Sequence, residues 1–345
     1  MQALVTQPGK THTTHIEDVP AVKAREGEVL VRTLEVGVCG TDREISEGLF
    51  GVAPENESLL VLGHEALAVV ERDGYGFTRG QLVTATVRRS CGHCIACAEG
   101  SPDSCLSGDY RERGITCLDG YDRELVAEDP AQLVEIPKSL GRLGVLAEPT
   151  SICERALRHS RTIGSRQPWQ LERALVIGAG AIGLLTTYLL RLADVAVWTA
   201  SLEPENELVE QSGARYVSTH DTELSDLGKF DLVVEAAGNA QLMAQTLGLL
   251  GRSGVACLLG IDPRKQTVEI DGPVLGVDTI LENRVLFGSV NARREDWLAA
   301  VADLDRARER WPEALERFVT LRVPLDRFAE AFEHRAGKAT LVLSD

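Results

Sequence analysis

Short apolar runs separated by helix-length segments dominate the second half of the chain. These runs lie at residues 175–177, 195–198, 232–234, 255–259 and 285–287. The strands of a parallel sheet are covered by helices on both faces, so they read as continuous apolar runs rather than as alternating ones. Segments 182–192 and 240–250 have the length and apolar spacing of crossover helices. The pattern predicts repeated strand–helix–strand units around a parallel sheet.

The first 150 residues show a different pattern. Short runs rich in β-branched residues, such as 28–33, are broken by turns that contain glycine, which predicts a β-rich domain. An amphipathic stretch at 297–310 precedes an apolar tail at 339–343. A chain of 345 residues exceeds the usual size of one hydrophobic core. We therefore expect an α/β protein of two domains.

The charge of the chain narrows the classes of partner. The formal net charge is −16, and such a surface repels nucleic-acid phosphates and anionic lipids. The amino terminus has no basic region followed by an apolar one, and no apolar run is long enough to span a bilayer. We expect a cytoplasmic protein that acts on a small molecule and binds neither nucleic acid nor membrane.

A glycine-rich turn follows the apolar run that ends at Ile177. It has the form G-x-G-x-x-G and opens a predicted helix, which is the context that dinucleotide binding requires. The three glycines allow a tight turn, close approach of a pyrophosphate and close packing of helix on strand. The predicted cofactor-binding residues of this turn are Gly178, Ala179, Gly180, Ala181, Ile182 and Gly183.

The kind of nicotinamide cofactor stays open at this point. No acidic residue stands at the tip of the second strand to bind a ribose 2′-hydroxyl, and no arginine stands there to meet a 2′-phosphate. Ser201 could serve either cofactor. Glu203 disfavours a phosphate slightly, although an ordinary solvated loop carboxylate is the better interpretation of it.

Four cysteines lie within fifteen residues in the pattern C-x2-C-x2-C-x7-C. They are Cys91, Cys94, Cys97 and Cys105. Four thiolates at this spacing can close a tetrahedral zinc site without an open position, which indicates a structural role. An iron–sulfur cluster is the competing interpretation, because clusters use similar spacings.

A second group of ligand-type residues indicates a catalytic metal. Cys39, His64 and Glu65 follow β-like runs in the first domain, and Glu148 stands where that domain ends. Thiolate, imidazole and carboxylate suit zinc. An open zinc position would stabilise a substrate alkoxide during hydride transfer, and Thr41 could carry the released proton. Whether Glu65 or Glu148 is the resting ligand stays open.

With these residues in view, the whole chain resembles the zinc-dependent medium-chain alcohol dehydrogenase superfamily. The resemblance rests on residues 38–42 (Val-Cys-Gly-Thr-Asp), 62–66 (Leu-Gly-His-Glu-Ala), 133–137, 176–183 and the cysteine segment. It implies a GroES-like catalytic domain formed by residues 1–150 and 295–345, with a structural zinc lobe at 91–105. A Rossmann dinucleotide-binding domain is expected at 151–294. The implied cofactors are two zinc ions per chain and NAD(P).

Within that superfamily the chain is most similar to the glucose 1-dehydrogenase branch. The similarity rests on residues 87–89, 111–115, 148–157 and 288–291. It implies that Glu112 and Asn291 bind sugar hydroxyls, that Glu148 lies at the zinc, and that an aldose is oxidised at C1 to its lactone. The further implied substrate-binding residues are Thr41 and Arg89; the further implied cofactor-binding residues are Leu259, Ser289 and Asn291.

Two departures from the branch leave alternatives open. Members that use NADP often carry two arginines after the second strand, where this chain has Ser201 and Leu202. Residues 116–121 also differ from the usual pattern beside the expected substrate site. A polyol (sorbitol-type) or threonine dehydrogenase is the nearest alternative. A non-catalytic dinucleotide-binding relative and a zinc-containing nucleic-acid binder are alternatives of another class. The resemblance also implies a homodimer or homotetramer.

Overall fold

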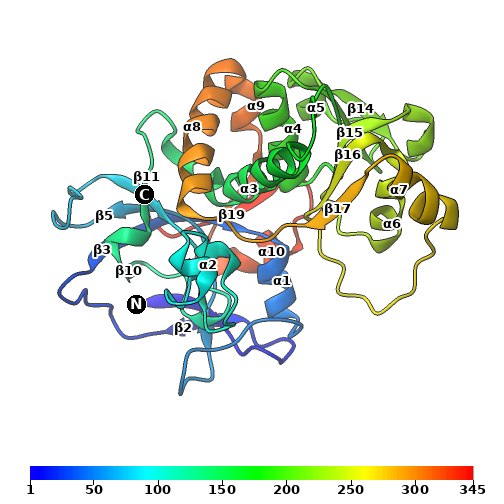
Figure 1. Cartoon of the computed structure of the whole chain (residues 1–345). Helices are drawn as coiled ribbons and strands as arrows, with labels where there is room; N and C mark the ends of the chain where they lie inside the picture. The colour runs from blue at the N-terminus through cyan, green and yellow to red at the C-terminus, as the bar shows by residue number, and fades with distance from the viewer. Residues whose placement is uncertain (345) are drawn as a thin grey trace. The chain divides into compact units, whose positions relative to one another are not determined.

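The computed structural model describes residues 1–344 and divides them into two compact units (Figure 1). The first unit contains residues 1–151, 291–305 and 319–345, of which residue 345 lies outside the described part. The second unit contains residues 152–290 and 306–318. Residues from both ends of the chain therefore build one unit, and the middle of the chain builds the other.

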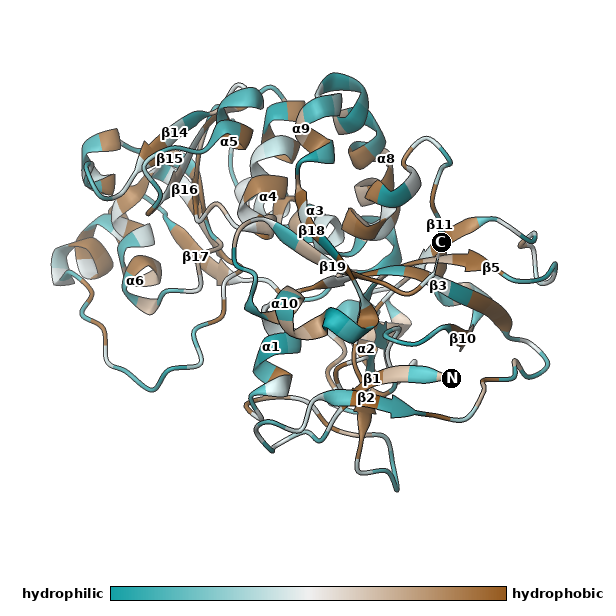
Figure 2. Ribbon diagram, turned by 180° about the vertical axis from the view of Figure 1, so that it is seen from behind, coloured by the Kyte–Doolittle hydropathy of each residue, from teal (hydrophilic) through white to brown (hydrophobic). Residues whose placement is uncertain are grey.

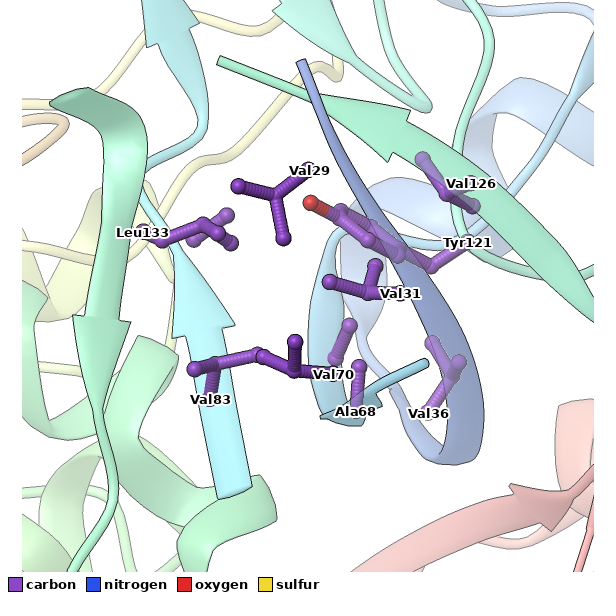
Figure 3. Close-up of a cluster of buried hydrophobic side chains, with 11 residues drawn as sticks. Val29, Val31, Val36, Ala68, Val70, Val83, Tyr121, Val126 and Leu133 are labelled. Atoms are coloured by element: carbon purple, nitrogen blue, oxygen red, sulfur yellow. The ribbon is translucent and has the colours of Figure 1, made fainter. Parts of the chain in front are cut away.

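A seven-stranded sheet forms the centre of the first unit. Six strands follow the order β11-β6-β5-β3-β19-β18, and β10 pairs with β3. Their bounds are β3 Val29–Val38, β5 Glu65–Val70, β6 Leu82–Ala85, β10 Leu125–Glu128, β11 Leu133–Glu135, β18 Val319–Pro324 and β19 Lys338–Val342. Val29, Val31 and Val36 of β3 pack into one core with Val70, Val83 and Tyr121 (Figure 3). Because β19 lies antiparallel to β3, the C-terminal residues complete this sheet.

Two small sheets and several short helices complete the first unit. One sheet has the strand order β2-β1-β4 and the other β7-β8-β9. The bounds are β1 Gln2–Thr6, β2 His15–Asp18, β4 Leu60–Val61, β7 Arg88–Arg89, β8 Arg111–Arg113, β9 Cys117–Leu118, α1 Gly40–Ser46, α2 Ile95–Ala98 and α10 Phe328–Glu333. Thr41 lies on α1 and Cys97 on α2, and Cys39 and Cys94 are the N-caps of these two helices.

The second unit is built on a six-stranded parallel sheet with the order β14-β13-β12-β15-β16-β17. The strands are β12 Arg173–Ile177, β13 Ala196–Ser201, β14 Arg215–Ser218, β15 Phe230–Glu235, β16 Leu250–Leu258 and β17 Val285–Gly288. The order reverses between β12 and β15, which is the switch point where such sheets bind ligands. Helices α4 Ala181–Leu192 and α6 Ala240–Leu249 lie on opposite faces of the sheet (Figure 1). The predicted α/β class with a parallel sheet is confirmed.

The boundary of the second unit differs from the sequence expectation. Residues 306–318 were expected with the first domain, but they group with the parallel sheet. The physical reason is aromatic packing against the Tyr188 ring on α4. Its ring centroid lies 5.1 Å from that of Trp311 and 5.0 Å from that of Phe318, and both contacts are edge-on. The remaining helices include α3 Ala147–Gly164, α5 Glu207–Gln211, α7 Thr279–Leu281, α8 Arg294–Arg310 and α9 Pro312–Glu316.

No helix within residues 1–344 combines the length and apolar character that crossing a membrane requires.

Candidate active site

Three ligand-type side chains of the first unit converge on one point. Cys39 is the N-cap of α1, His64 follows β4, and Glu65 begins β5. One ligand atom from each lies within 4.8 Å of the others, and Cys39 Sγ is 3.2 Å from His64 Nε2. His64 and Glu65 are buried, while Cys39 is half-buried. Sulfur, nitrogen and oxygen donors at this separation fit one zinc ion, because zinc accepts all three types at 2.0–2.3 Å.

The Asp42 carboxylate lies beside the His64 ring, a placement that the sequence analysis did not predict. Its Oδ1 lies 3.4 Å from His64 Nδ1, and its Oδ2 accepts the Cys39 backbone N–H at 2.9 Å. A carboxylate behind a metal-binding histidine leaves the other ring nitrogen free for the metal. Burial opposes protonation of His64, but the Cys39 and Asp42 charges raise its pKa well above the usual value. The site therefore attracts positive charge.

Lys338 pairs with Glu65, a second contact that the sequence analysis did not predict. Its ammonium group forms a buried ion pair with Glu65 Oε2. Gly37 pairs with Glu65 across β3 and β5, and a Cβ at Gly37 would lie 2.1 Å from Glu65 Oε2. The absent side chain at Gly37 thus provides the space that the carboxylate occupies. Only the register of β19 against β3 brings Lys338 to this point.

Glu148 lies near this cluster without joining the group of three. It is buried at the start of α3. Burial and the neighbouring Glu65 charge raise the pKa of Glu148 to about 7. Its carboxylate is not among the ligand atoms that lie within 4.8 Å of one another. The structure thus brings Cys39, His64 and Glu65 together, and metal binding by Glu148 stays a prediction.

Glu112 and Asn291, which are 179 residues apart in sequence, are hydrogen-bonded in the first unit. Asn291 Nδ2 donates to Glu112 Oε1 at 2.8 Å. Arg88 approaches the same oxygen with Nε at 3.0 Å and with Nη2 at 2.9 Å. Among residues 1–344, no donor contacts Glu112 Oε2. Arg88 and Asn291 therefore hold the carboxylate by one oxygen and leave the other as an acceptor.

Arg89 has a different neighbourhood from the one expected for a substrate contact. Its Nη2 lies 2.8 Å from Glu128 Oε2, and its Nη1 donates to the Thr86 carbonyl. Glu128 also accepts from Tyr121 Oη at 2.7 Å. Neighbouring residues on a strand point to opposite sides, so Arg88 faces Glu112 while Arg89 faces this buried network. The sequence could not show which of the two arginines meets Glu112.

The glycine turn of the second unit has the geometry that its motif requires. Gly178 has φ +106°, and a Cβ at Gly183 would lie 1.9 Å from the Gly178 carbonyl oxygen. A Cβ at Gly180 would meet no atom within 4 Å. Gly178 and Gly183 thus serve the turn and its packing, whereas Gly180 is the exposed N-cap of α4. An open glycine at a helix N-terminus can receive a pyrophosphate.

The other predicted cofactor residues lie at the carboxyl ends of neighbouring strands. Ser201 ends β13, Leu259 follows β16, and Ser289 follows β17. The Ser289 backbone N–H donates to the Leu258 carbonyl at 3.1 Å. The buried Ser289 hydroxyl has no hydrogen-bond partner within residues 1–344. Open α/β sheets bind ligands outside these strand ends.

The four clustered cysteines form a compact group beside α2. The Sγ–Sγ distances are 3.4 Å for Cys94–Cys97, 3.6 Å for Cys91–Cys105, 3.8 Å for Cys91–Cys97 and 3.9 Å for Cys94–Cys105. Four sulfurs bound at about 2.3 Å to one tetrahedral ion would lie about 3.8 Å apart. An iron–sulfur cluster spreads its thiolates over different irons. The spacing therefore favours a single ion over a cluster.

Two family profiles match the chain. The profile described as "Alcohol dehydrogenase GroES-like domain" matches residues 25–138. The profile described as "Glucose dehydrogenase C-terminus" matches residues 141–344, which is more than half of the chain.

Curated relatives match over nearly the whole length. The glucose 1-dehydrogenase of Methanocella arvoryzae is 38% identical over 345 residues, with 96% of each chain covered. That of Thermoproteus tenax is 38% identical over 344 residues, again with 96% of each covered. Among solved structures, the Haloferax mediterranei glucose dehydrogenase in complex with NADP, Zn and gluconolactone superposes with a TM-score of 0.91. It has 33% identity, and each chain is covered completely.

Proposed function

The chain belongs to the glucose dehydrogenase family, and from that membership we propose that it is a zinc-dependent enzyme oxidising C1 of an aldose with NAD(P). The product is the aldonolactone. The main observation in favour of an aldose substrate is the geometry of the Glu112 carboxylate. Arg88 and Asn291 hold one of its oxygens, and the other oxygen is left as a hydrogen-bond acceptor. Sugars carry several neighbouring hydroxyl groups, and a site built to hydrogen-bond them discriminates strongly against molecules that lack them.

Cys39, His64 and Glu65 would hold the catalytic zinc, with Glu148 as a further candidate ligand. Zinc supplies Lewis acidity, which lowers the pKa of a bound hydroxyl group. Asp42 keeps His64 Nε2 directed at the site, and Lys338 balances the charge of Glu65. Thr41, whose backbone N–H donates to Cys39 Sγ at 3.2 Å, is the proposed carrier of the substrate proton.

The cofactor occupies the carboxyl ends of the parallel strands in this proposal. Its pyrophosphate lies on the turn that contains Gly178, Gly180 and Gly183. Ser201, Leu259, Ser289 and Asn291 are the further proposed contacts. The similar Haloferax enzyme was solved with NADP, which supports a nicotinamide cofactor here.

The cysteine lobe would hold a second, structural zinc ion. We expect Cys97→Ser to reduce the zinc content from two ions to one per chain, because three thiolates bind zinc more weakly than four. Unfolding should begin at a lower temperature, since zinc binding contributes to folding. Metal analysis and thermal unfolding check both expectations. The control is Cys117→Ser, outside the lobe, which should keep two zinc ions; equal zinc content in both variants would contradict the structural site.

A substrate panel tests the proposed activity directly. The zinc-loaded protein would receive D-glucose, D-galactose, D-xylose, sorbitol and L-threonine, each with NAD and with NADP, and formation of reduced nicotinamide would be followed. Oxidation of an aldose alone supports the proposal. Oxidation of only sorbitol or threonine would favour the polyol or threonine alternative. Cofactor binding without any turnover would favour the non-catalytic alternative.

The sugar contact of Glu112 makes a separate prediction. Glu112→Gln should raise the KM for the aldose about tenfold or more, because a charged hydrogen bond to a hydroxyl group contributes about 1.5–3 kcal/mol. Steady-state kinetics with varied sugar checks the result. The matched control is Glu57→Gln on the exposed surface; a similar KM for both variants would contradict the proposed contact.

The assembly and location of the chain are also proposals. Strand β17, which is largely brown in Figure 2, is an edge of the parallel sheet, and its Leu286 is 40% exposed. An exposed apolar edge strand favours pairing with another chain, so we propose a homodimer or a homotetramer formed through this edge. The eight cysteines form no disulfide within residues 1–344. Thiolates must stay reduced to bind zinc, so we propose a cytoplasmic location.

A further inference from the structure

The end of strand β13 lies directly beside the glycine turn. The Gly178 backbone N–H donates to the Ala200 carbonyl at 2.7 Å, and β13 continues the sheet next to β12. In a doubly wound sheet the pyrophosphate lies on the first turn, and the adenosine ribose lies at the tip of the second strand. Ser201 and the residues after it therefore stand where the ribose 2′ position would lie.

Glu203 is held at this tip by both its side chain and its main chain. The Ser201 hydroxyl donates to Glu203 Oε2. Tyr216 Oη donates to the Glu203 carbonyl at 2.6 Å and lies 2.9 Å from Ser201 Oγ. Glu203 is exposed to solvent. Glu203 is thus an exposed acceptor held by one hydrogen bond to its side chain and one to its main chain, which the sequence alone could not show.

The segment that follows this tip is acidic. Residues 201–214 contain four glutamates and neither lysine nor arginine. In the described part of the chain, Glu203 forms no ion pair with a basic side chain. A 2′-phosphate brings a charge of about −1.5 to −2 and needs basic partners. A ribose 2′-hydroxyl needs only an acceptor, which Glu203 offers.

We propose that Glu203, positioned by Ser201 and Tyr216, accepts the ribose 2′-hydroxyl and selects NAD over NADP. The inference rests on the proposed dehydrogenase function and deepens it by naming the cofactor. The proposed preference for NAD differs from the cofactor in the solved complex of the similar Haloferax enzyme, which contains NADP. Repulsion between Glu203 and a 2′-phosphate disfavours NADP, and the hydrogen bond to the hydroxyl group favours NAD.

Equilibrium binding without sugar tests the inference. The zinc-loaded enzyme would be titrated with NADH and with NADPH, and binding would be followed by calorimetry. We expect the Kd for NADPH to exceed that for NADH at least about tenfold, as one charged hydrogen bond and one repulsion imply. Glu203→Gln should reduce the ratio of the NADPH Kd to the NADH Kd about tenfold, mainly by making NADPH bind more tightly. Equal Kd values, or tighter NADPH, in the parent enzyme would overturn the proposal.

Two further variants test whether the position of Glu203, and not merely its negative charge, sets the preference for NADH. Glu205→Gln removes the same charge two residues away, from an exposed side chain, and should leave the ratio within about twofold because exposed charges interact weakly. Tyr216→Phe removes the hydroxyl that holds Glu203 and should lower the ratio part of the way. Equal effects of Glu203→Gln and Glu205→Gln would overturn the inference. Binding of neither nucleotide would instead overturn the proposed function, and this inference with it.

Discussion

Replacing His64 with alanine is expected to lower kcat by at least about a thousandfold and to remove one of the two zinc ions per chain. A thousandfold loss corresponds to about 4 kcal/mol of transition-state stabilisation. His64 Nε2 lies 3.2 Å from Cys39 Sγ, so its removal leaves a thiol and a carboxylate as the remaining donors of the group. Two donors do not hold zinc in the tetrahedral geometry that three or four provide. Metal analysis and steady-state kinetics on the same sample check both effects.

The control for this prediction is His15→Ala. His15 lies on β2 in the same unit, is about half exposed, and its ring contacts Thr13 and Glu17. It should keep both zinc ions and the parent kcat within about twofold, because exposed ion pairs contribute little. The assignment of the catalytic metal to Cys39, His64 and Glu65 would fail if His64→Ala retained two zinc ions or reacted within tenfold of the parent.

Asp42 is expected to affect zinc binding indirectly, through its contact with the zinc ligand His64. Its contact with His64 Nδ1 is 3.4 Å, and a partner in this position typically changes metal affinity by about 10–100-fold. The sequence contains Asp42 three residues after Cys39, yet its role depends on α1 turning the carboxylate back toward His64. The capping box at the start of α1, in which Asp42 accepts the Cys39 backbone N–H, produces that turn. A search for such boxes beside ligand residues could have found it.

The fold was predictable because its strongest signals are local. Continuous apolar runs marked β12, β13, β15, β16 and β17, and the glycine turn marked the first crossover. The cysteine spacing marked the lobe in the same way. Each of these patterns depends on neighbours in the sequence. The end of the second unit was not predictable in this manner, since residues 306–318 belong there through the contacts of Trp311 and Phe318 with Tyr188.

The parts of the site that escaped prediction depend on pairing between distant segments. Lys338 reaches Glu65 only because β19 pairs with β3 in one register, and a shift of one residue would turn Lys338 to the other face. Arg88, rather than Arg89, meets Glu112 because β7 pairs with β8. Residue types identified the chemistry of the site, and strand register decided which neighbour takes part in it.

Two glycines of the same turn should respond to substitution in opposite ways. Gly183→Val is expected to destabilise the protein by about 2–3 kcal/mol, as overpacking of a close contact does. A Cβ there would lie 1.9 Å from the Gly178 carbonyl, a backbone atom that cannot move without opening the turn. Valine has a better intrinsic helix propensity than glycine, so a loss of stability would have to come from the clash.

Gly180→Ala should instead leave the unfolding free energy within about 0.5 kcal/mol, because a Cβ there meets no atom within 4 Å and φ is −72°. It should weaken nicotinamide binding about tenfold or more, since the methyl group would occupy the space that the pyrophosphate approaches. Denaturant unfolding and NADH titration of both variants separate the two effects. If Gly180→Ala were as destabilising as Gly183→Val, or bound NADH as tightly as the parent, the turn would not be the pyrophosphate site. Loss of binding with stability retained would place the cofactor on Gly180, because only a ligand can then meet the added methyl group.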